Sequence, residues 1–157
     1  MAVAVSKGGF GLRFNVDPHR ELSTRAGRRF AKLADGDEIV GVAVARSSSA
    51  LTVVSAAARV LFCAVSEIPE LANPGRGVIL LKLAEADAVL GFAVGPRQDK
   101  EALTVETDGG KRLTVGPGRH EITARGGTGH LLGRKLRIVR VVPPEPVLAP
   151  PSSNLPN

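Results

Sequence analysis

The sequence predicts an all-β fold, organised as a propeller-like array in which about three units are visible. The chain has 157 residues, of which 43% are hydrophobic, and it contains five Phe but no Trp or Tyr. A chain that leaves its core to Val, Leu, Ile and Ala, with 18 glycines between short apolar runs, favours strands over helices. The other two observations are an internal repeat and the alternation of its apolar runs.

The internal repeat is clearest in two segments that share their order of residues. Residues 32–44 read KLADGDEIVGVAV and residues 82–94 read KLAEADAVLGFAV, so that most positions match at an offset of 50. Asp37 and its counterpart Asp87 precede the matched strands, where an Asp usually accepts main-chain N–H bonds in a turn. Units of this length with several short strands are typical of propeller blades, because one blade cannot bury its apolar face alone.

Upstream of these segments, a second pair of matched runs predicts further strands. GLRFNV at 11–16 corresponds to VLFCAV at 60–65, with Phe14 matched to Phe62. In DEIVGVAVA at 37–45 the apolar residues lie on both faces of the predicted strand. Such a strand is expected in the interior of a sheet.

These blocks divide the chain into blades and a tail. We expect blades at approximately 1–45, 46–95 and 96–142, the third being a looser copy that contains KRLTV and RKLRIVRVV. Residues 143–157 read PPEPVLAPPSSNLPN, and this proline-rich composition predicts a disordered tail.

The net charge of +6 is distributed unevenly along the chain. Residues 1–34 carry seven basic and two acidic residues, residues 35–108 six basic and eleven acidic, and residues 109–142 eight basic and one acidic. Segregation of this kind predicts a basic face, for which an extended polyanion is the usual partner. The alternative is that the arginines are simply solvated surface residues.

No pattern of catalytic or metal-binding residues stands out. The single Cys63 excludes an intrachain disulfide, and its apolar neighbours predict a buried, inert thiol. The histidines His19, His120 and His130 lack metal-ligand spacing, so no metal site is expected. The glycines of RGGTGHLLGRK at 125–135 fit neither the Walker loop nor the dinucleotide fingerprint, and no small-molecule substrate is expected.

The sequence shows no sign of membrane insertion. The apolar stretch in MAVAVSKGG is too short for a signal peptide, and no segment approaches the roughly 20 apolar residues of a membrane span. A cytoplasmic protein is the simplest inference.

The candidate binding site is a set of basic glycine turns, one in each repeat. Glycines let phosphates approach main-chain N–H groups and arginines neutralise them, so a row of such turns suits a DNA backbone. The scarcity of aromatic residues disfavours stacking on single strands and therefore favours duplex DNA. Any one such turn, taken alone, is more often a turn with a solvated arginine. The residues assigned to DNA binding are Arg25, Arg28, Arg29, Lys32, Arg76, Lys111, Arg112, Arg125, Gly126, Gly127, Arg134 and Lys135.

The order of these blocks resembles a known family. RVLFCAVSEIPEL, NPGRGVILLKL, GGKRLTV and RGGTG, followed by a closing basic strand, are similar to the C-terminal domain of the DNA-cleaving A subunits of bacterial type IIA topoisomerases. The topoisomerase IV branch is the nearer match and DNA gyrase a close second, and the resemblance covers roughly residues 8–142. It implies a β-pinwheel, a propeller-like array whose blades exchange strands and whose basic outer rim bends DNA.

The resemblance also implies a non-catalytic role in selecting DNA crossings for an ATP-dependent type II topoisomerase. Family members cleave DNA through a tyrosine in a separate region, and this chain contains no tyrosine. ATP and Mg²⁺ would belong to other domains of the parent enzyme, so no cofactor is expected in this chain. The implied partners are double-stranded DNA and the A and B subunits of the parent topoisomerase, at a nucleoid-associated location.

Two departures from the family pattern bear on function. The segment TARGGTG at 123–129 matches a wrapping motif similar to QRRGGKG at its arginine and three glycines, but Thr128 stands in place of lysine. This puts gyrase-type wrapping in doubt. The visible blades are also fewer than the family generally has, so we expect part of a larger array or a reduced version of it.

A second hypothesis comes from another class of function. The chain could be a structural or protein-interaction fragment of a propeller whose basic rim binds an acidic protein. An excess of unrelated duplex DNA would displace the partner only if DNA is the ligand.

Overall fold

The computed structural model describes residues 1–23 and 25–145, and all of its paired strands run antiparallel. Single-turn 3₁₀-helices at Asp17–His19, Val65–Glu67 and Pro117–Arg119 are the only helical elements of the described residues. The prediction of an all-β fold is therefore confirmed. The strands are Ala2–Ser6 (β1), Phe10–Phe14 (β2), Ile39–Val44 (β3), Ala50–Ser55 (β4), Arg59–Ala64 (β5), Val78–Ile79 (β6), Val89–Gly95 (β7), Leu103–Thr107 (β8), Arg112–Val115 (β9), His130–Leu131 (β10) and Ile138–Val142 (β11).

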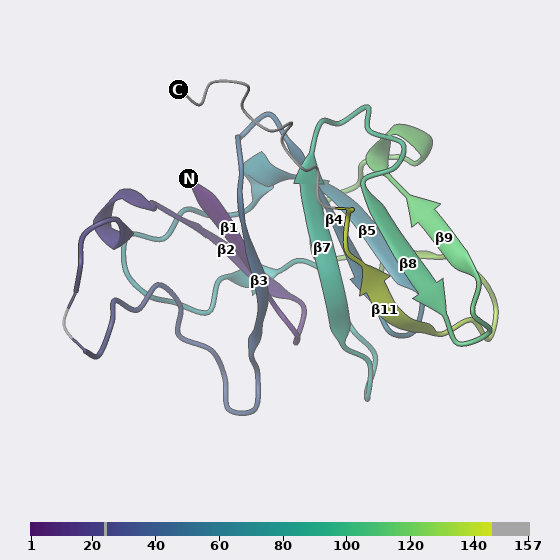
Figure 1. Ribbon diagram of the computed structural model, residues 1–157, viewed down its shortest axis with the longest axis horizontal. Coiled ribbons are helices and arrows are strands. Elements are labelled where there is room, and N and C mark those ends of the chain that lie inside the picture. Colours follow the sequence, from purple (N-terminus) through teal and green to yellow (C-terminus); the bar gives the residue numbers. More distant parts are fainter. Residues whose placement is uncertain (24, 146–157) are drawn as a thin grey trace, which may run out of the picture.

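Three sheets stand side by side along the long axis of the molecule (Figure 1). Their strand orders are β3-β1-β2-β6, β10-β5-β4-β7 and β11-β8-β9, and we name them blade 1, blade 2 and blade 3. Each blade contains a hairpin and an inner strand that comes later in the chain, namely β3, β7 or β11. The inner strands β3 and β7, and likewise β7 and β11, lie next to each other.

Neighbouring repeats exchange a short strand. β6 lies in the second repeat but pairs with β2 of blade 1, and β10 lies in the third repeat but pairs with β5 of blade 2. The ranges 46–95 and 96–142 thus each contribute one strand to the sheet of the range before it. Most of the predicted tail, residues 146–157, lies outside the described residues.

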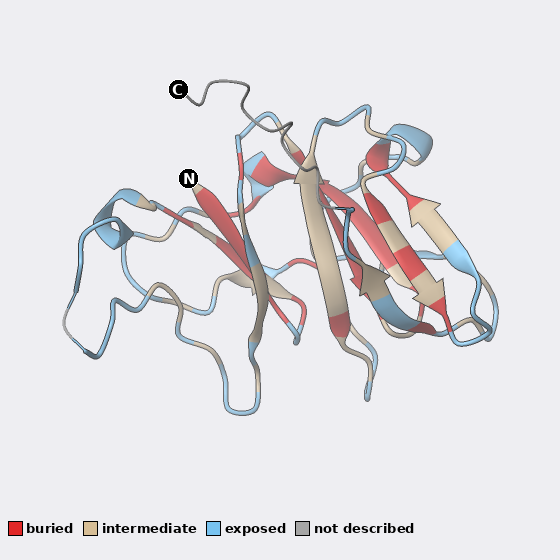
Figure 2. Ribbon diagram, viewed as in Figure 1, coloured by how far each residue is buried: buried red, intermediate tan, exposed pale blue. Residues whose placement is uncertain are grey.

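Apolar clusters lie between neighbouring blades. The buried residues are concentrated on the strands of the blades, which are red in Figure 2 over much of β1, β4 and β5. Strand β5 alternates between them, because Leu61 and Cys63 face blade 1 whereas Val60 and Phe62 face blade 3. Both faces of the central hairpin are covered, so β4 is buried along its whole length. The prediction of a buried thiol is confirmed, since Cys63 has no exposed surface and burial raises the pKa of its thiol to about 12.

A carboxylate closes the hairpin turn of blades 1 and 2 in the same way. Asp37 accepts hydrogen bonds from the main-chain N–H of Gly8 at 2.8 Å and from the Ser6 hydroxyl at 2.7 Å. Asp87 accepts the N–H of Ala57 at 2.9 Å. The expected turn role of both Asp residues is confirmed, and the bonds fix each inner strand beside its hairpin.

Two sequence-based expectations are wrong in detail. The hairpins align at an offset of 49, because the N–H of Phe10 bonds to Ser6 Oγ just as that of Arg59 bonds to Ser55 Oγ. Phe14 is therefore equivalent to Cys63 and not to Phe62, a shift of one residue that moves a side chain to the other face of a strand.

The second error concerns the strand predicted as interior. β3 lies at the edge of its sheet, and Val42 and Val44 on it are 47% and 80% exposed. A neighbouring blade covers only one of its faces, where Gly41 meets Phe92 of β7, whereas the other face carries the exposed Val42 and Val44. Coverage by a neighbouring layer does not require a hydrogen-bonded strand on each edge.

Candidate nucleic-acid interface

The segment between hairpin and inner strand of each repeat, which we call a linker, lies beside the linker of the next repeat. Linkers 1, 2 and 3 comprise residues 15–38, 65–88 and 116–137. Ala31 forms a parallel bridge with Gly75, and Leu81 forms one with Gly127. The N–H groups of Lys32 and Lys82 donate to the carbonyls of these two glycines at 2.9 Å and 2.8 Å. The structure thus joins the three linkers, each of which contains a basic glycine turn, into one continuous row, the linker row.

A left-handed glycine marks the same point in all three turns. Gly27, Gly77 and Gly129 have φ angles of +69°, +81° and +72°, and bulkier residues rarely adopt this conformation. Relative to this glycine, Arg25 lies two residues earlier, whereas Arg76 lies one residue earlier and Arg125 four. The turn geometry therefore repeats along the chain, whereas the positions of the arginines relative to it do not.

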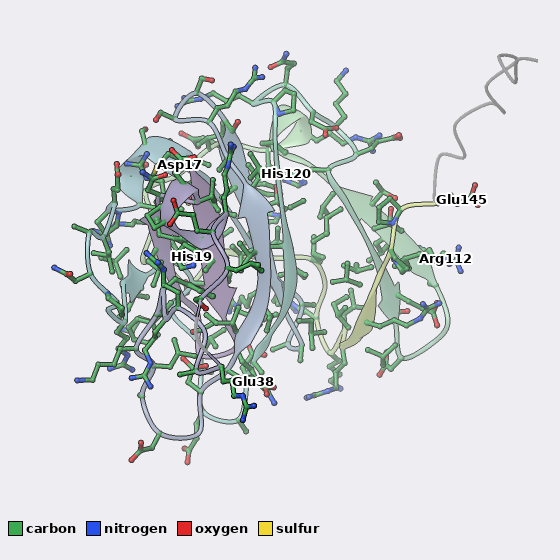
Figure 3. The ribbon with its side chains drawn as sticks, turned by 60° about the vertical axis from the view of Figure 1, so that its left-hand side comes forward. Asp17, His19, Glu38, Arg112, His120 and Glu145 are labelled. Carbon is green, nitrogen blue, oxygen red and sulfur yellow. The ribbon has the colours of Figure 1, made fainter. Side chains whose placement is uncertain are left out.

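Linker 1 carries the densest group of exposed cations. Arg25, Arg28, Arg29 and Lys32 are all exposed or partly exposed. Arg28 and Arg29 border a hollow lined by an aromatic cluster, in which Phe14 and Phe30 stack with ring centroids 4.6 Å apart and His19 meets Phe14 edge-on at 5.4 Å. His19 lies beside blade 1 in Figure 3. The stacking of Phe30 on Phe14 anchors the residue next to Arg29 against strand β2.

Linker 2 places one arginine on an aromatic ring. The guanidinium carbon of Arg76 lies 3.8 Å from the ring centroid of Phe10, the first residue of β2. A cation–π contact of this kind restricts the side chain while leaving its N–H donors directed to solvent. Arg76 remains exposed and is available to a phosphate.

Linker 3 uses its arginine differently. Arg125 Nε donates to the carbonyl of Glu67 at 3.0 Å, and its Nη1 donates to the carbonyl of Ile79 at 3.4 Å. The N–H of Gly126 donates to the carbonyl of Leu80 at 2.6 Å. Arg125 and Gly126 thus fasten linker 3 to linker 2, and DNA contact by either residue stays a prediction.

A hollow beside the third turn holds two histidines. His120 stacks on Phe62 with centroids 4.9 Å apart and lies 5.3 Å from His130 of the exchanged strand β10. Partial burial, then the neighbouring His130 and Arg119, lower the pKa of His120 below its usual 6.5. Among the described residues, no group of three or more His, Cys, Asp and Glu side chains is placed to hold a metal ion.

The remaining assigned residues divide between two places. Arg134 and Lys135 lie exposed on linker 3, downstream of β10. Lys111 and Arg112 belong to the hairpin of blade 3, and Arg112 lies on the far side of the molecule from His19 (Figure 3). Lys111 and Arg112 therefore lie outside the linker row.

The sequence-based set of site residues lacks Lys82. It is exposed, and its N–H bonds to Gly127 as that of Lys32 bonds to Gly75. The signal was present in the sequence, because Lys82 matches Lys32 in the repeat at an offset of 50.

The first two repeats, with linkers 1 and 2, match a known family. A family model described as DNA gyrase C-terminal domain, beta-propeller, matches residues 1–46 and 51–95, which is more than half of the chain. The chain belongs to this family. The matched ranges contain the hairpins and inner strands of blades 1 and 2 of this chain. A search of curated proteins found no match.

Solved structures share the fold of this chain. The C-terminal domain of DNA topoisomerase IV superposes with a TM-score of 0.78 at 21% identity, and a DNA gyrase A C-terminal domain with 0.71 at 20%. The E. coli ParC C-terminal domain gives 0.70 at 22%. Each match covers 90% of this chain but only 45%, 47% and 59% of the respective solved chain, so the chain spans about half their length. The predicted β-pinwheel, propeller-like fold is confirmed.

The described residues contain no helix with the length and apolar character needed to cross a membrane.

Proposed function

We propose that this chain is a non-catalytic module of the A subunit of a type II topoisomerase, and that it binds duplex DNA through backbone phosphates. The observation that carries the proposal is the linker row, in which Ala31 adjoins Gly75 and Leu81 adjoins Gly127. Membership of the DNA gyrase C-terminal domain family supports it. Double-stranded DNA and the parent A and B subunits are the proposed partners, with selection of DNA crossings as the role.

The physical basis of the proposal is a line of cations along neighbouring segments. A duplex presents regularly spaced phosphates, and cations displace the counterions condensed on them. The cationic side chains of the row lie on successive linkers, so one DNA backbone running across the linkers meets them in turn. The solvent-accessible cations of the row are Arg25, Arg28, Arg29, Lys32, Arg76, Lys82, Arg134 and Lys135.

Fluorescence anisotropy of a labelled duplex, titrated with the chain at several salt concentrations, tests the proposal. We expect log K to fall linearly with log salt, with a slope of about −0.9 for each phosphate contact. Absence of binding at low salt, or a flat salt response, would contradict it. An excess of poly-glutamate that displaces the protein as readily as unlabelled duplex does would favour the acidic-protein alternative.

A pair of double variants separates the linker row from net charge. Replacing Arg28 and Arg29 by Ser should make the salt slope less steep by about 2, since roughly one unit is lost per phosphate contact. The control replaces Arg46 and Arg97 by Ser, which removes the same charge from exposed positions on the connections between blades. If both double variants weakened DNA binding equally, the linker row would not be the binding site.

A further inference from the structure

One row of residues recurs in the same register in all three blades, on the face directed toward the next blade. It consists of a residue of the first hairpin strand and its pairing partners on both sides. The rows are Val5 with Gly11 and Gly41 in blade 1, Val54 with Val60 and Gly91 in blade 2, and Glu106 with Arg112 and Arg140 in blade 3. The first two rows are apolar, and the third is charged.

In blades 1 and 2 the row receives the inner strand of the following blade. A Cβ atom at Gly41 would lie 3.0 Å from Cε1 of Phe92 on β7. A Cβ at Gly91 would lie 2.7 Å from Cγ2 of Val141 on β11. These glycines therefore leave the space in which the next blade packs.

In blade 3 the space is filled by an ionic row. Arg140 Nη2 lies 2.8 Å from Glu106 Oε2, and Arg112 Nε lies 3.8 Å from the same oxygen. The side chains of Arg140 and Arg112 are 49% and 61% exposed. Stacking a blade on this face would remove these charges from water, which is costly unless every group gains a new partner.

The outer face of blade 1, by contrast, carries apolar residues at the stacking positions. Val42 and Val44 of blade 1 correspond in register to Phe92 and Val94 of blade 2, which pack into the core between blades 1 and 2. In blade 1 the two valines are 47% and 80% exposed. The outer faces of blade 1 and blade 3 therefore differ in chemistry.

We propose that the Glu106 row makes blade 3 an end blade, which prevents a second copy of this chain from stacking its blade 1 head to tail on blade 3. The second copy is the fitting partner because its Val42 and Val44 occupy the positions by which blade 2 packs on blade 1. Charge at the Glu106 row, rather than the shape of blade 3, blocks this contact.

Sedimentation equilibrium of the chain and of a triple variant tests the proposal. Glu106→Val, Arg112→Val and Arg140→Gly together give blade 3 the row of blade 2. We expect the triple variant to self-associate at least about tenfold more tightly than the unchanged chain. Equal self-association of the two proteins would overturn the proposal.

Two further variants identify the contact and protect the test. Adding Val44→Asp to the triple variant should abolish the increase in self-association. An increase that persists would show that blade 1 is not the partner. If circular dichroism shows that the triple variant does not fold, Glu106→Gln, Arg112→Gln and Arg140→Gln together remove the charges of the row while keeping long side chains. The control variant carries Glu101→Gln, Arg119→Gln and Arg137→Gln, which remove the same charges from exposed positions outside the row. Only the first of these two variants should strengthen association, and the same result from both would also overturn the proposal.

Discussion

Arg125 is tied to Glu67, 58 positions earlier in the chain, by two hydrogen bonds. Its Nε donates to the Glu67 carbonyl at 3.0 Å, and its main-chain N–H donates to a Glu67 carboxylate oxygen at 3.2 Å. These bonds join linker 3 to the start of linker 2. Arg125 therefore supports the architecture of the linker row before any ligand arrives.

Replacing Arg125 with Ala should lower the free energy of unfolding by about 1 kcal/mol, because main-chain carbonyls of linker 2 lose their donors. Urea denaturation followed by circular dichroism measures the change. Arg28→Ala is the control, since an exposed surface substitution usually changes stability by less than about 0.5 kcal/mol. Equal stability of the two variants would mean that the Arg125 bonds contribute nothing.

Replacing Thr128 with Lys should tighten DNA binding. Thr128 precedes the left-handed Gly129, as Arg76 precedes Gly77, so a lysine there places a cation on the third turn where the second has one. We expect the salt slope in the anisotropy assay to steepen by about 1. Gln98→Lys adds the same charge to the exposed connection between β7 and β8. A gain of equal size from Gln98→Lys would show that only net charge matters.

Replacing Asp87 with Ala should destabilise the protein by about 1–3 kcal/mol, because the N–H groups of Ala57 and Ala88 lose a charged acceptor. Asp87→Asn keeps a side-chain oxygen and should lose less. Thermal and urea denaturation of the two variants give the comparison. Asp35→Ala, an exposed loss of the same charge, should have little effect. Similar losses for Asp35→Ala and Asp87→Ala would contradict a turn-specific role.

The lowered pKa of His120 predicts a loss of stability at acidic pH. Burial, His130 and Arg119 make the folded protein bind this proton more weakly than the unfolded chain does. The stabilisation is therefore complete above the ordinary pKa of 6.5 and is lost as the pH falls through the lower pKa of the folded state. Urea midpoints measured from about pH 7.5 to about pH 5 should fall less in His120→Gln than in the unchanged protein. An identical fall in both proteins would assign the effect to other groups.

The fold class and the repeat could be predicted from the sequence because both depend on local features. Short apolar runs, turn glycines and the match of Asp37 to Asp87 reflect hydrogen bonding and strand periodicity among residues close in the chain. The same local pattern predicts a glycine turn in each repeat, and the linkers that contain these turns adjoin one another in the structure.

Tertiary packing, by contrast, determines which cations face outward and which blade face carries an ionic row. The bonds of Arg125 to Glu67 and Ile79, and the ion pair of Glu106 with Arg140, join residues 34 to 58 positions apart. The one-residue shift that makes Phe14 equivalent to Cys63 likewise depends on hairpin register, which an alignment of the repeats by identical residues does not reveal. A side chain's partners depend on packing between blades, and that packing brings together residues whose separation in sequence carries no local signal.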